Sequence, residues 1–426
     1  MKNKNVPQQS TLRPWRFWVG ILFSILLMQM PAQSQVVSLD SMLSVIDRQN
    51  PMLQSYRSSV TALHNYTAGS KAQMAPEVGG GLWMFPYRKQ EVGHLQDPRQ
   101  VMVSVTQTFT NPAKLKARYN YLHSKAAIEQ AGERIAYNEL RAQAKAAYYT
   151  LAILHQKQEV FKQAKATLNL MLTTTQARYS YNQARLNTIY KTEAVLYELA
   201  NMALMVESEE HHAHTTLLQL MNLPPHTLLK VDTVLPGAFV ASKTDTLLLA
   251  AQRSDVKRMD RTIQAMRYNQ ALEKAQRKPD FNLNFSHMFS VGAGMPNQFM
   301  LLGMVTIPIA PWSAKMYKAN VQAMNYEIES MKQERVAMLN EAQAMAANML
   351  AELRTLKQQL ENYEIRILPT LKKNYEVLLL AYSENREDLP MVLDGWDAYT
   401  MTHLQYLDTK IKYYIYVSDA PNCSFG

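Results

Sequence analysis

The sequence is short of the residues that interrupt regular structure. Its 426 residues include 13 glycines, 18 prolines and one cysteine. An average chain of this length would contain about 30 glycines. The shortage excludes collagen-like, glycine-linker and disulfide-scaffold proteins, and it predicts long helices with few turns.

Long hydrophobic runs are also scarce. The mean hydropathy of −0.27 is too low for a bundle of membrane-spanning helices, each of which needs about 20 apolar residues. One shorter run, Val19 to Met30, follows four basic residues and precedes the small-residue segment Ala32 to Ser34. This pattern predicts a secretory signal peptide over residues 1–34. Because no cysteine adjoins the expected cleavage site, we expect no N-terminal lipid anchor.

Net charge gives little support for a nucleic-acid partner. The formal charge of the whole chain is +10. Removal of the signal peptide takes away four basic residues and no acids, which leaves +6. These remaining charges are spread along the sequence, whereas nucleic-acid binding typically uses a clustered basic face.

An internal duplication organises the chain. The segment Lys71 to Glu77 is similar to Lys274 to Asp280, and Tyr179 to Asn182 is similar to Tyr382 to Asn385, both at a shift of 203 residues. One unit of about 200 residues has therefore been repeated, which excludes short-period repeat arrays of roughly 20 to 50 residues. The predicted division is signal peptide 1–34, first repeat 35–223, linker 224–243, second repeat 244–418 and tail 419–426.

Each repeat predicts the same order of elements: a helix, two strands, a long helix and a shorter helix. The periodicity changes from helical to alternating after Pro76 and after Pro279. Pro369 is expected to kink the second long helix. The predicted first-repeat elements are helix 38–73, strands 77–85 and 99–109, long helix 113–178 and helix 184–223. Their second-repeat counterparts are helix 244–276, strands 280–289 and 299–307, long helix 313–383 and helix 390–417.

The strands alternate between apolar and polar residues, so each has two chemically different faces. A length of 9 to 11 residues is what a tilted transmembrane strand needs. On the strands alone, a soluble hairpin is the favoured interpretation. The apolar face contains Val101, Val103, Val105, Phe281, Leu283 and Phe285, and the polar face contains Ser104, Thr106, Asn282 and Asn284.

The long helices carry apolar or small residues at steps of three and four, which predicts coiled-coil-like packing. A helix of about 65 residues is roughly 100 Å long, which no ordinary globular domain requires. The predicted seams comprise Leu140, Ala144, Ala147, Leu151 and Leu154, then Phe161, Ala164, Leu168 and Met171, and in the second repeat Leu353, Leu356, Leu360, Tyr363 and Ile367.

Catalytic motifs are missing from the sequence: it has no glycine-rich phosphate loop, Cys-x-x-Cys pair or Gly-x-Ser-x-Gly elbow. The cluster containing Glu207, His211 and His214 is a weak metal-site candidate, since two or three of these side chains share a helix face with suitable ligand chemistry. A solvated helix surface is the favoured explanation of this cluster. The 26 methionines suit Cu(I) chemically but fall within the apolar helix pattern, which favours core packing. We expect no enzyme activity and no cofactor.

The repeated Tyr-Ser-x-Asn segments predict tight turns between paired helices. Asn182 and Asn385 are expected to adopt positive φ, because asparagine is the best substitute for glycine there. Charge is concentrated around both turns. The predicted tip residues are Tyr179, Asn182 and Arg185 in the first repeat, and Tyr382, Asn385, Arg386, Glu387, Asp388 and Asp394 in the second.

At this point the sequence resembles the TolC-like outer-membrane factor family of Gram-negative efflux and type I secretion systems. The most specific similarity is the turn from Tyr382 to Asn385 followed by Val392-Leu393-Asp394. The resemblance implies an α+β membrane protein whose long helical hairpins form a periplasmic tunnel. It also implies a homotrimer in which four strands per protomer complete a 12-stranded outer-membrane barrel. The implied partners are a periplasmic adaptor protein and an inner-membrane pump of the RND or ABC class.

By this resemblance, Asp394 lines the closed periplasmic end of the tunnel and Tyr382 helps to hold the gate shut. The chain departs from the family pattern at Thr188, where relatives often have an acid, and at both tip asparagines, where they have glycine. The implied function is a passive exit duct. The alternative is a periplasmic helical-hairpin adaptor or another coiled-coil binding protein, which would account for one long hairpin but not for two repeats with four strands. The cargo stays open among metal ions, drugs, lipids and polypeptides.

Overall fold

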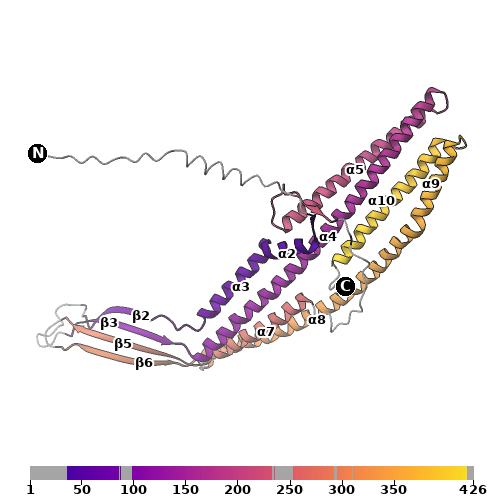
Figure 1. The fold of residues 1–426 in the computed structure, drawn as a ribbon. Coiled ribbons are helices and arrows are strands. Elements are labelled where there is room, and N and C mark those ends of the chain that lie inside the picture. The colour runs from indigo at the N-terminus through magenta and orange to yellow at the C-terminus, as the bar shows by residue number, and fades with distance from the viewer. Residues whose placement is uncertain are drawn as a thin grey trace, which may run out of the picture.

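The computed structural model describes residues 36–85, 87, 98–232, 235, 253–291, 295–308 and 310–419. The molecule is elongated, with a β-sheet at one end and two helical hairpins that reach the other end (Figure 1). The predicted signal peptide and most of the predicted tail lie outside the described residues. Among the helices that are described, none has the length and hydropathy to cross a membrane.

The first helical segment is divided in two, so the prediction of a single helix over 38–73 is wrong. Helix α2 (Leu39–Gln49) ends at Asn50, and helix α3 (Pro51–Gly69) begins directly after it. Asn50 has extended backbone geometry, and its side chain accepts a hydrogen bond from the Met52 amide. Proline disfavours helical geometry in the residue before it, so Pro51 separates the two helices.

The four strands form one antiparallel sheet in the order β2-β3-β5-β6. The central pair, β3 with β5, joins one strand from each repeat. The strands of both repeats therefore belong to a single sheet. Strands β2 and β6 form its two edges. The strands are β2 (Glu77–Trp83), β3 (Gln100–Phe109), β5 (Asp280–Ser290) and β6 (Gln298–Thr306).

The first repeat continues into helix α4 (Pro112–Ser180) and returns in helix α5 (Leu186–Leu220). Helix α4 has 69 residues, so at 1.5 Å per residue it is about 100 Å long. Every residue of its two predicted seams is buried except Ala147, which packs against the same core. Buried residues recur along α4 from Ser124 to Thr175, and this repeated burial helps to stabilise so long a helix.

The second repeat differs from the first in the middle of its long helix. A five-residue π-helical turn, η2 (Tyr363–Ile367), replaces regular helix just before Pro369. Within the predicted seam, Leu353 and Leu356 are buried, whereas Ile367 is exposed. A π turn inserts one extra residue and rotates the helix beyond it, so the 3.5-residue spacing cannot continue through it. The helices of this repeat are α7 (Ser254–Ala275), α8 (Pro311–Asn362), α9 (Leu368–Ser383) and α10 (Leu389–Asp419).

The linker between the repeats contains a short strand, so it is not entirely irregular. Strand β4 (Lys230–Val231) pairs in parallel with strand β1 (Val36–Val37), so the start of the described chain lies beside the linker. Residues 236–252, which include the predicted start of the second repeat, are outside the described part.

Helices α9 and α10 approach each other closely at Gly395. A Cβ atom there would lie 2.6 Å from Leu378 Cδ1 and 3.8 Å from the Tyr375 Cα. We therefore expect Gly395→Val to destabilise this hairpin by about 1–3 kcal/mol, the usual cost of overpacking. Amide hydrogen exchange in α9 and α10 should then be about 5 to 150 times faster.

The matched control is Gly69→Val, because nothing lies within 4 Å of a Cβ at Gly69. Equal exchange rates in the two variants would contradict close packing at Gly395.

Candidate functional site: the two-faced sheet and the hairpin tips

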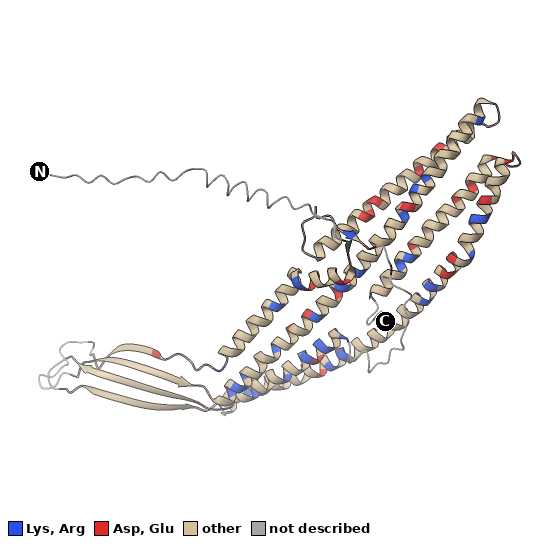
Figure 2. Ribbon diagram, viewed as in Figure 1, with Lys and Arg blue, Asp and Glu red and all other residues tan. Residues whose placement is uncertain are grey.

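The sheet has one apolar face and one face with polar side chains. The predicted apolar residues of β3 and β5 are all exposed, with Val101 at 37% and Phe281 at 50%. No Lys or Arg occurs in any of the four strands, as Figure 2 shows. An exposed apolar sheet face without cations is unstable in water and suits contact with lipid.

The opposite face is a ladder of hydrogen bonds. The Asn284 side chain donates to Thr106 Oγ1 at 2.7 Å, and the Ser286 hydroxyl donates to Asn284 Oδ1 at 2.8 Å. Thr108 donates to Asn282 Oδ1 at 2.5 Å, across the same strand pair. Strand β6 departs from the pattern, because Met300, Leu302 and Met304 pair with this polar stretch of β5. The polar face is therefore strongest along the central strands.

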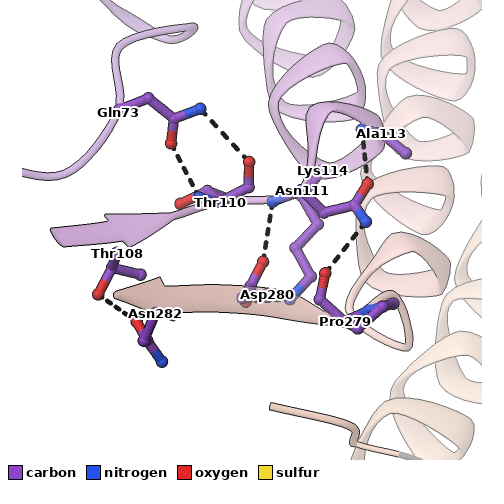
Figure 3. Close-up of polar contacts among 9 residues, drawn as sticks. All are labelled: Gln73, Thr108, Thr110, Asn111, Ala113, Lys114, Pro279, Asp280 and Asn282. Carbon is purple, nitrogen blue, oxygen red and sulfur yellow. Dashed lines mark hydrogen bonds and ion pairs between the residues drawn. The ribbon is translucent and has the colours of Figure 1, made fainter. Parts of the chain in front are cut away.

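A polar cluster fixes the sheet to the helices (Figure 3). The Asn111 side chain caps α4 by accepting from the Ala113 amide at 2.9 Å, and it also donates to the Pro279 carbonyl at 3.0 Å. The Asp280 carboxylate accepts from the Asn111 amide at 2.9 Å and from Lys114 Nζ at 2.5 Å. Asn111 and Lys114 belong to the first repeat and Asp280 to the second, so this cluster ties the repeats together where the strands end.

The two hairpin tips have the backbone geometry expected from sequence. Asn182 has a φ of 60° and Asn385 a φ of 61°, which confirms the predicted left-handed positions. In each turn, the amide of the next residue donates back to the last helical turn, from Gln183 to Arg178 and from Arg386 to Ala381. These bonds satisfy carbonyls that a helix end otherwise leaves free.

One contact between the tips involves a residue that sequence analysis did not single out. The Arg178 guanidinium, on α4, lies over the Tyr382 ring on α9, 4.3 Å from the ring centroid. The same guanidinium lies 3.5 Å from the Tyr382 carbonyl oxygen. The Tyr382 hydroxyl is buried and, within the described structure, has no hydrogen-bond partner. The aromatic ring, and not the hydroxyl, therefore joins the two hairpins.

A second contact pairs Lys191 on α5 with Asp394 on α10, at 2.8 Å. These residues are 203 apart, so they occupy equivalent positions in the two repeats and carry opposite charges. Burial raises the pKa of nearby Asp397, and the charges of Glu198 and Asp394 raise it further while Lys191 opposes them. Two other carboxylates and one lysine of the tip thus act on Asp397.

The remaining predicted tip residues do not link the hairpins. Arg386 pairs with Glu384 of its own turn at 3.2 Å. Thr188 is buried, and its carbonyl accepts the Thr192 hydroxyl at 2.9 Å. Tyr179, Arg185, Glu387 and Asp388 are exposed around the turns.

The weak metal-site candidates line an open cavity of about 1150 Å³ between α4 and α5. Glu207, His211 and His214 all face it, but the neighbouring Glu210 is bonded to α4 through His155 Nδ1 at 3.2 Å. Burial lowers the pKa of His214. Within the described ranges, no group of three or more His, Cys, Asp or Glu side chains is placed to hold a metal ion.

Comparison with known proteins identifies the fold. Neither a protein-family profile nor a curated protein sequence matches the chain. Among solved structures, the chain is similar to CusC, whose structures describe transmembrane channel formation, with a TM-score of 0.75 and 15% identity over 89% of this chain and 90% of that one. It is also similar to the CmeC outer-membrane channel of Campylobacter jejuni, with a TM-score of 0.72 and 12% identity over 98% and 93% of the two chains.

A third similar structure is the open state of the MtrE outer-membrane channel of Neisseria gonorrhoeae, with a TM-score of 0.71 and 13% identity over 89% and 87% of the chains. The chain therefore has the α+β fold of these channels across nearly its whole described length. This confirms the fold class expected from sequence.

Proposed function

We propose that the protein is an outer-membrane channel subunit, and that three copies close their sheets into one 12-stranded barrel. The observation that carries the proposal is the four-stranded sheet, which exposes an apolar face and leaves strands β2 and β6 as open edges. Open edges cannot lie in lipid, because their backbone groups would be unpaired. Pairing β2 of one copy with β6 of the next removes every edge, and the polar ladder then lines a water-filled lumen.

The helices extend this lumen on one side of the membrane. In the proposed assembly, the two hairpins of each copy pack beside those of its neighbours and form a tunnel in the periplasm of a Gram-negative bacterium. The proposed role is a passive exit duct that contributes conduction and no chemical step. A periplasmic adaptor and an inner-membrane pump of the RND or ABC class are the proposed partners, because such a duct needs an energy source elsewhere.

Purification in mild detergent tests this proposal. We expect a particle of three chains by light scattering with correction for bound detergent, and stepwise ion conductance in planar bilayers. Cell fractionation should place the chain in the outer membrane. Monomers without conductance would contradict the proposal, and a protein released with the periplasmic fraction would favour the adaptor alternative.

The tip carboxylates are expected to make the duct cation-selective, because a ring of carboxylates favours cations in a narrow pore. Asp394→Asn removes one charge per chain and also leaves Lys191 without its partner. We therefore expect a clear loss of cation preference, measured as a shift of reversal potential in a salt gradient. Lys191→Gln should shift it in the opposite direction.

The same selectivity should depend on pH. Asp397 has a raised pKa, so it becomes neutral at a higher pH than an ordinary aspartate. Cation preference should therefore begin to fall as pH is lowered, before ordinary aspartates protonate near pH 4. In Asp394→Asn this fall should move to lower pH, because one of the charges that raises the pKa of Asp397 is gone. An unchanged pH profile would show that Asp397 does not sense Asp394.

A further inference from the structure

The positive charge of the chain collects where the sheet meets the helices. Four junction segments, 70–77, 110–120, 271–280 and 310–320, contain nine basic residues and three carboxylates. Their net charge of +6 equals the whole net charge left after residue 34, so the rest of that chain is neutral overall. Charge that is spread over four segments of the sequence is thus gathered in the folded molecule, where blue residues mark the junction (Figure 2).

The fold brings these segments together through specific contacts. Lys114 of α4 pairs with Asp280 at the start of β5, and Glu273 of α7 accepts a hydrogen bond from Asn320 of α8 at 2.8 Å. Lys71 lies over the Tyr119 ring, 4.1 Å from its centroid. All four segments therefore surround the helical end of the sheet.

Most of the cations at this junction have no carboxylate partner. Lys114 is neutralised by Asp280, and Lys274 donates to the Gln270 side chain at 2.9 Å. Six others are exposed and form no ion pair with any described residue: Lys116, Arg118, Arg277, Lys278, Lys315 and Lys318. We name these six residues the basic collar. Unpaired like charges repel one another, so their proximity calls for an anionic partner.

The position of the collar identifies that partner. Strand β3 has ten residues, and a tilted strand of that length spans an apolar layer of about 25 Å. The collar begins immediately beyond the strands, at the depth of lipid headgroups. Trp312, 83% exposed, lies in the first turn of α8 at the same level, and tryptophan prefers this interface.

We propose that the basic collar binds the phosphate groups of anionic phospholipids in the leaflet next to the helical end of the sheet. This inference rests on the proposed function, which places the sheet in a membrane. The contacts are electrostatic and need no pocket, because several phosphates in a leaflet can each meet one or two cations. They would fix the depth of the barrel and hold the tunnel upright on the membrane surface.

Lipid binding by the full-length chain in neutral detergent tests the inference. Phosphatidylglycerol and phosphatidylcholine are titrated separately, and bound lipids are counted by native mass spectrometry. In the test variant, Arg277, Lys278, Lys315 and Lys318 are all changed to Gln. Each basic residue near an anionic surface contributes about fivefold to binding, so we expect the affinity for phosphatidylglycerol to fall at least about tenfold. Binding of phosphatidylcholine should not change.

The control variant removes the same charge elsewhere, by changing the exposed residues Lys165, Arg354, Lys372 and Lys373 to Gln. It should bind phosphatidylglycerol as the parent does. An equal loss of phosphatidylglycerol affinity in both variants, or no loss in the test variant, would overturn the proposal that the basic collar binds anionic phospholipids. Competition by inorganic phosphate at a matched concentration would show a site for free anions and would also overturn a lipid site.

Conductance of the same samples separates this inference from the proposed function. A test variant that forms pores and still binds phosphatidylglycerol as the parent does would overturn the lipid-binding inference and leave the channel proposal standing. Parent protein that forms neither trimers nor pores would overturn the channel, whatever its lipid binding.

Discussion

Arginine in place of Val103 is expected to prevent stable insertion of the protein into a bilayer, whereas arginine in place of its neighbour Ser104 is expected to be tolerated. Val103 lies in the middle of β3, is 43% exposed and pairs with Gly80 and His287. Ser104 is adjacent in sequence but points to the polar face, opposite Gly79 and Ser286. The two substitutions add the same charge to opposite faces of one strand.

The expected difference is large because the cost recurs in every copy. A lipid-facing arginine near the middle of a bilayer costs about 2–4 kcal/mol per chain, and three chains share one barrel. We expect Val103→Arg to be lost from the outer-membrane fraction and to yield few heat-resistant trimers. Val103→Leu serves as the control for a change of shape without charge.

Ser104→Arg should assemble normally but reduce conductance to cations, because the charge enters the lumen. Insertion of both arginine variants, or of neither, would contradict the assignment of the two faces.

Loss of the Arg178 side chain is expected to favour the open state of the tunnel. The guanidinium over the Tyr382 ring is one of two contacts described above between the tips of the two hairpins, and it lies nearest the turns. A cation–π contact contributes about 0.5–2 kcal/mol, and the proposed trimer has three. We therefore expect Arg178→Ala, and likewise Tyr382→Leu, to raise the open probability in planar bilayers by about tenfold or more.

Tyr382→Phe is the decisive companion variant. It keeps an aromatic ring beneath Arg178 and removes a buried hydroxyl that has no hydrogen-bond partner in the described structure. Removal of an unsatisfied buried group is neutral or stabilising, so this variant should conduct like the parent or open less often. Opening of Tyr382→Phe to the level of Tyr382→Leu would show that the hydroxyl holds the gate, and the cation–π interpretation would fail.

Local patterns in the sequence predicted local features well. The alternation in β3 and β5, the seam along α4 and the left-handed geometry of Asn182 and Asn385 all follow from periodicity or from the preference of one residue type. In each case the deciding interactions are close in sequence or repeat regularly along one element, so the sequence contains the necessary information.

Features that depend on distant parts of the chain were missed. The Arg178 contact joins residues 204 apart, and no spacing rule indicates which of many arginines will meet an aromatic ring. The pair of Lys191 and Asp394 was recognisable in the sequence, because the shift of 203 residues makes the two positions equivalent in the two repeats. Opposite charges at equivalent positions of a repeat could have indicated the pair.

Other errors arose because two signals compete at one place. Proline at 51 is compatible with the first residue of a helix and with a break in one. Here it is both, because α2 ends at Asn50 and Asn50 caps the start of α3. The kink predicted at Pro369 stays a prediction, but the sequence did not indicate the π turn that lies just before this proline. There the Tyr406 hydroxyl of α10 donates to Glu364 within the turn.

This π turn makes the two halves of a duplicated molecule mechanically unequal. Helix α4 is continuous over 69 residues and contains no proline after its first residue and no π turn. Its counterpart is divided by η2 into α8 and α9, and π turns and prolines are the points at which helices bend. We therefore expect the hairpin of the second repeat to bend more easily than that of the first. In the proposed trimer, movement at the tip would then arise from every second hairpin around the ring.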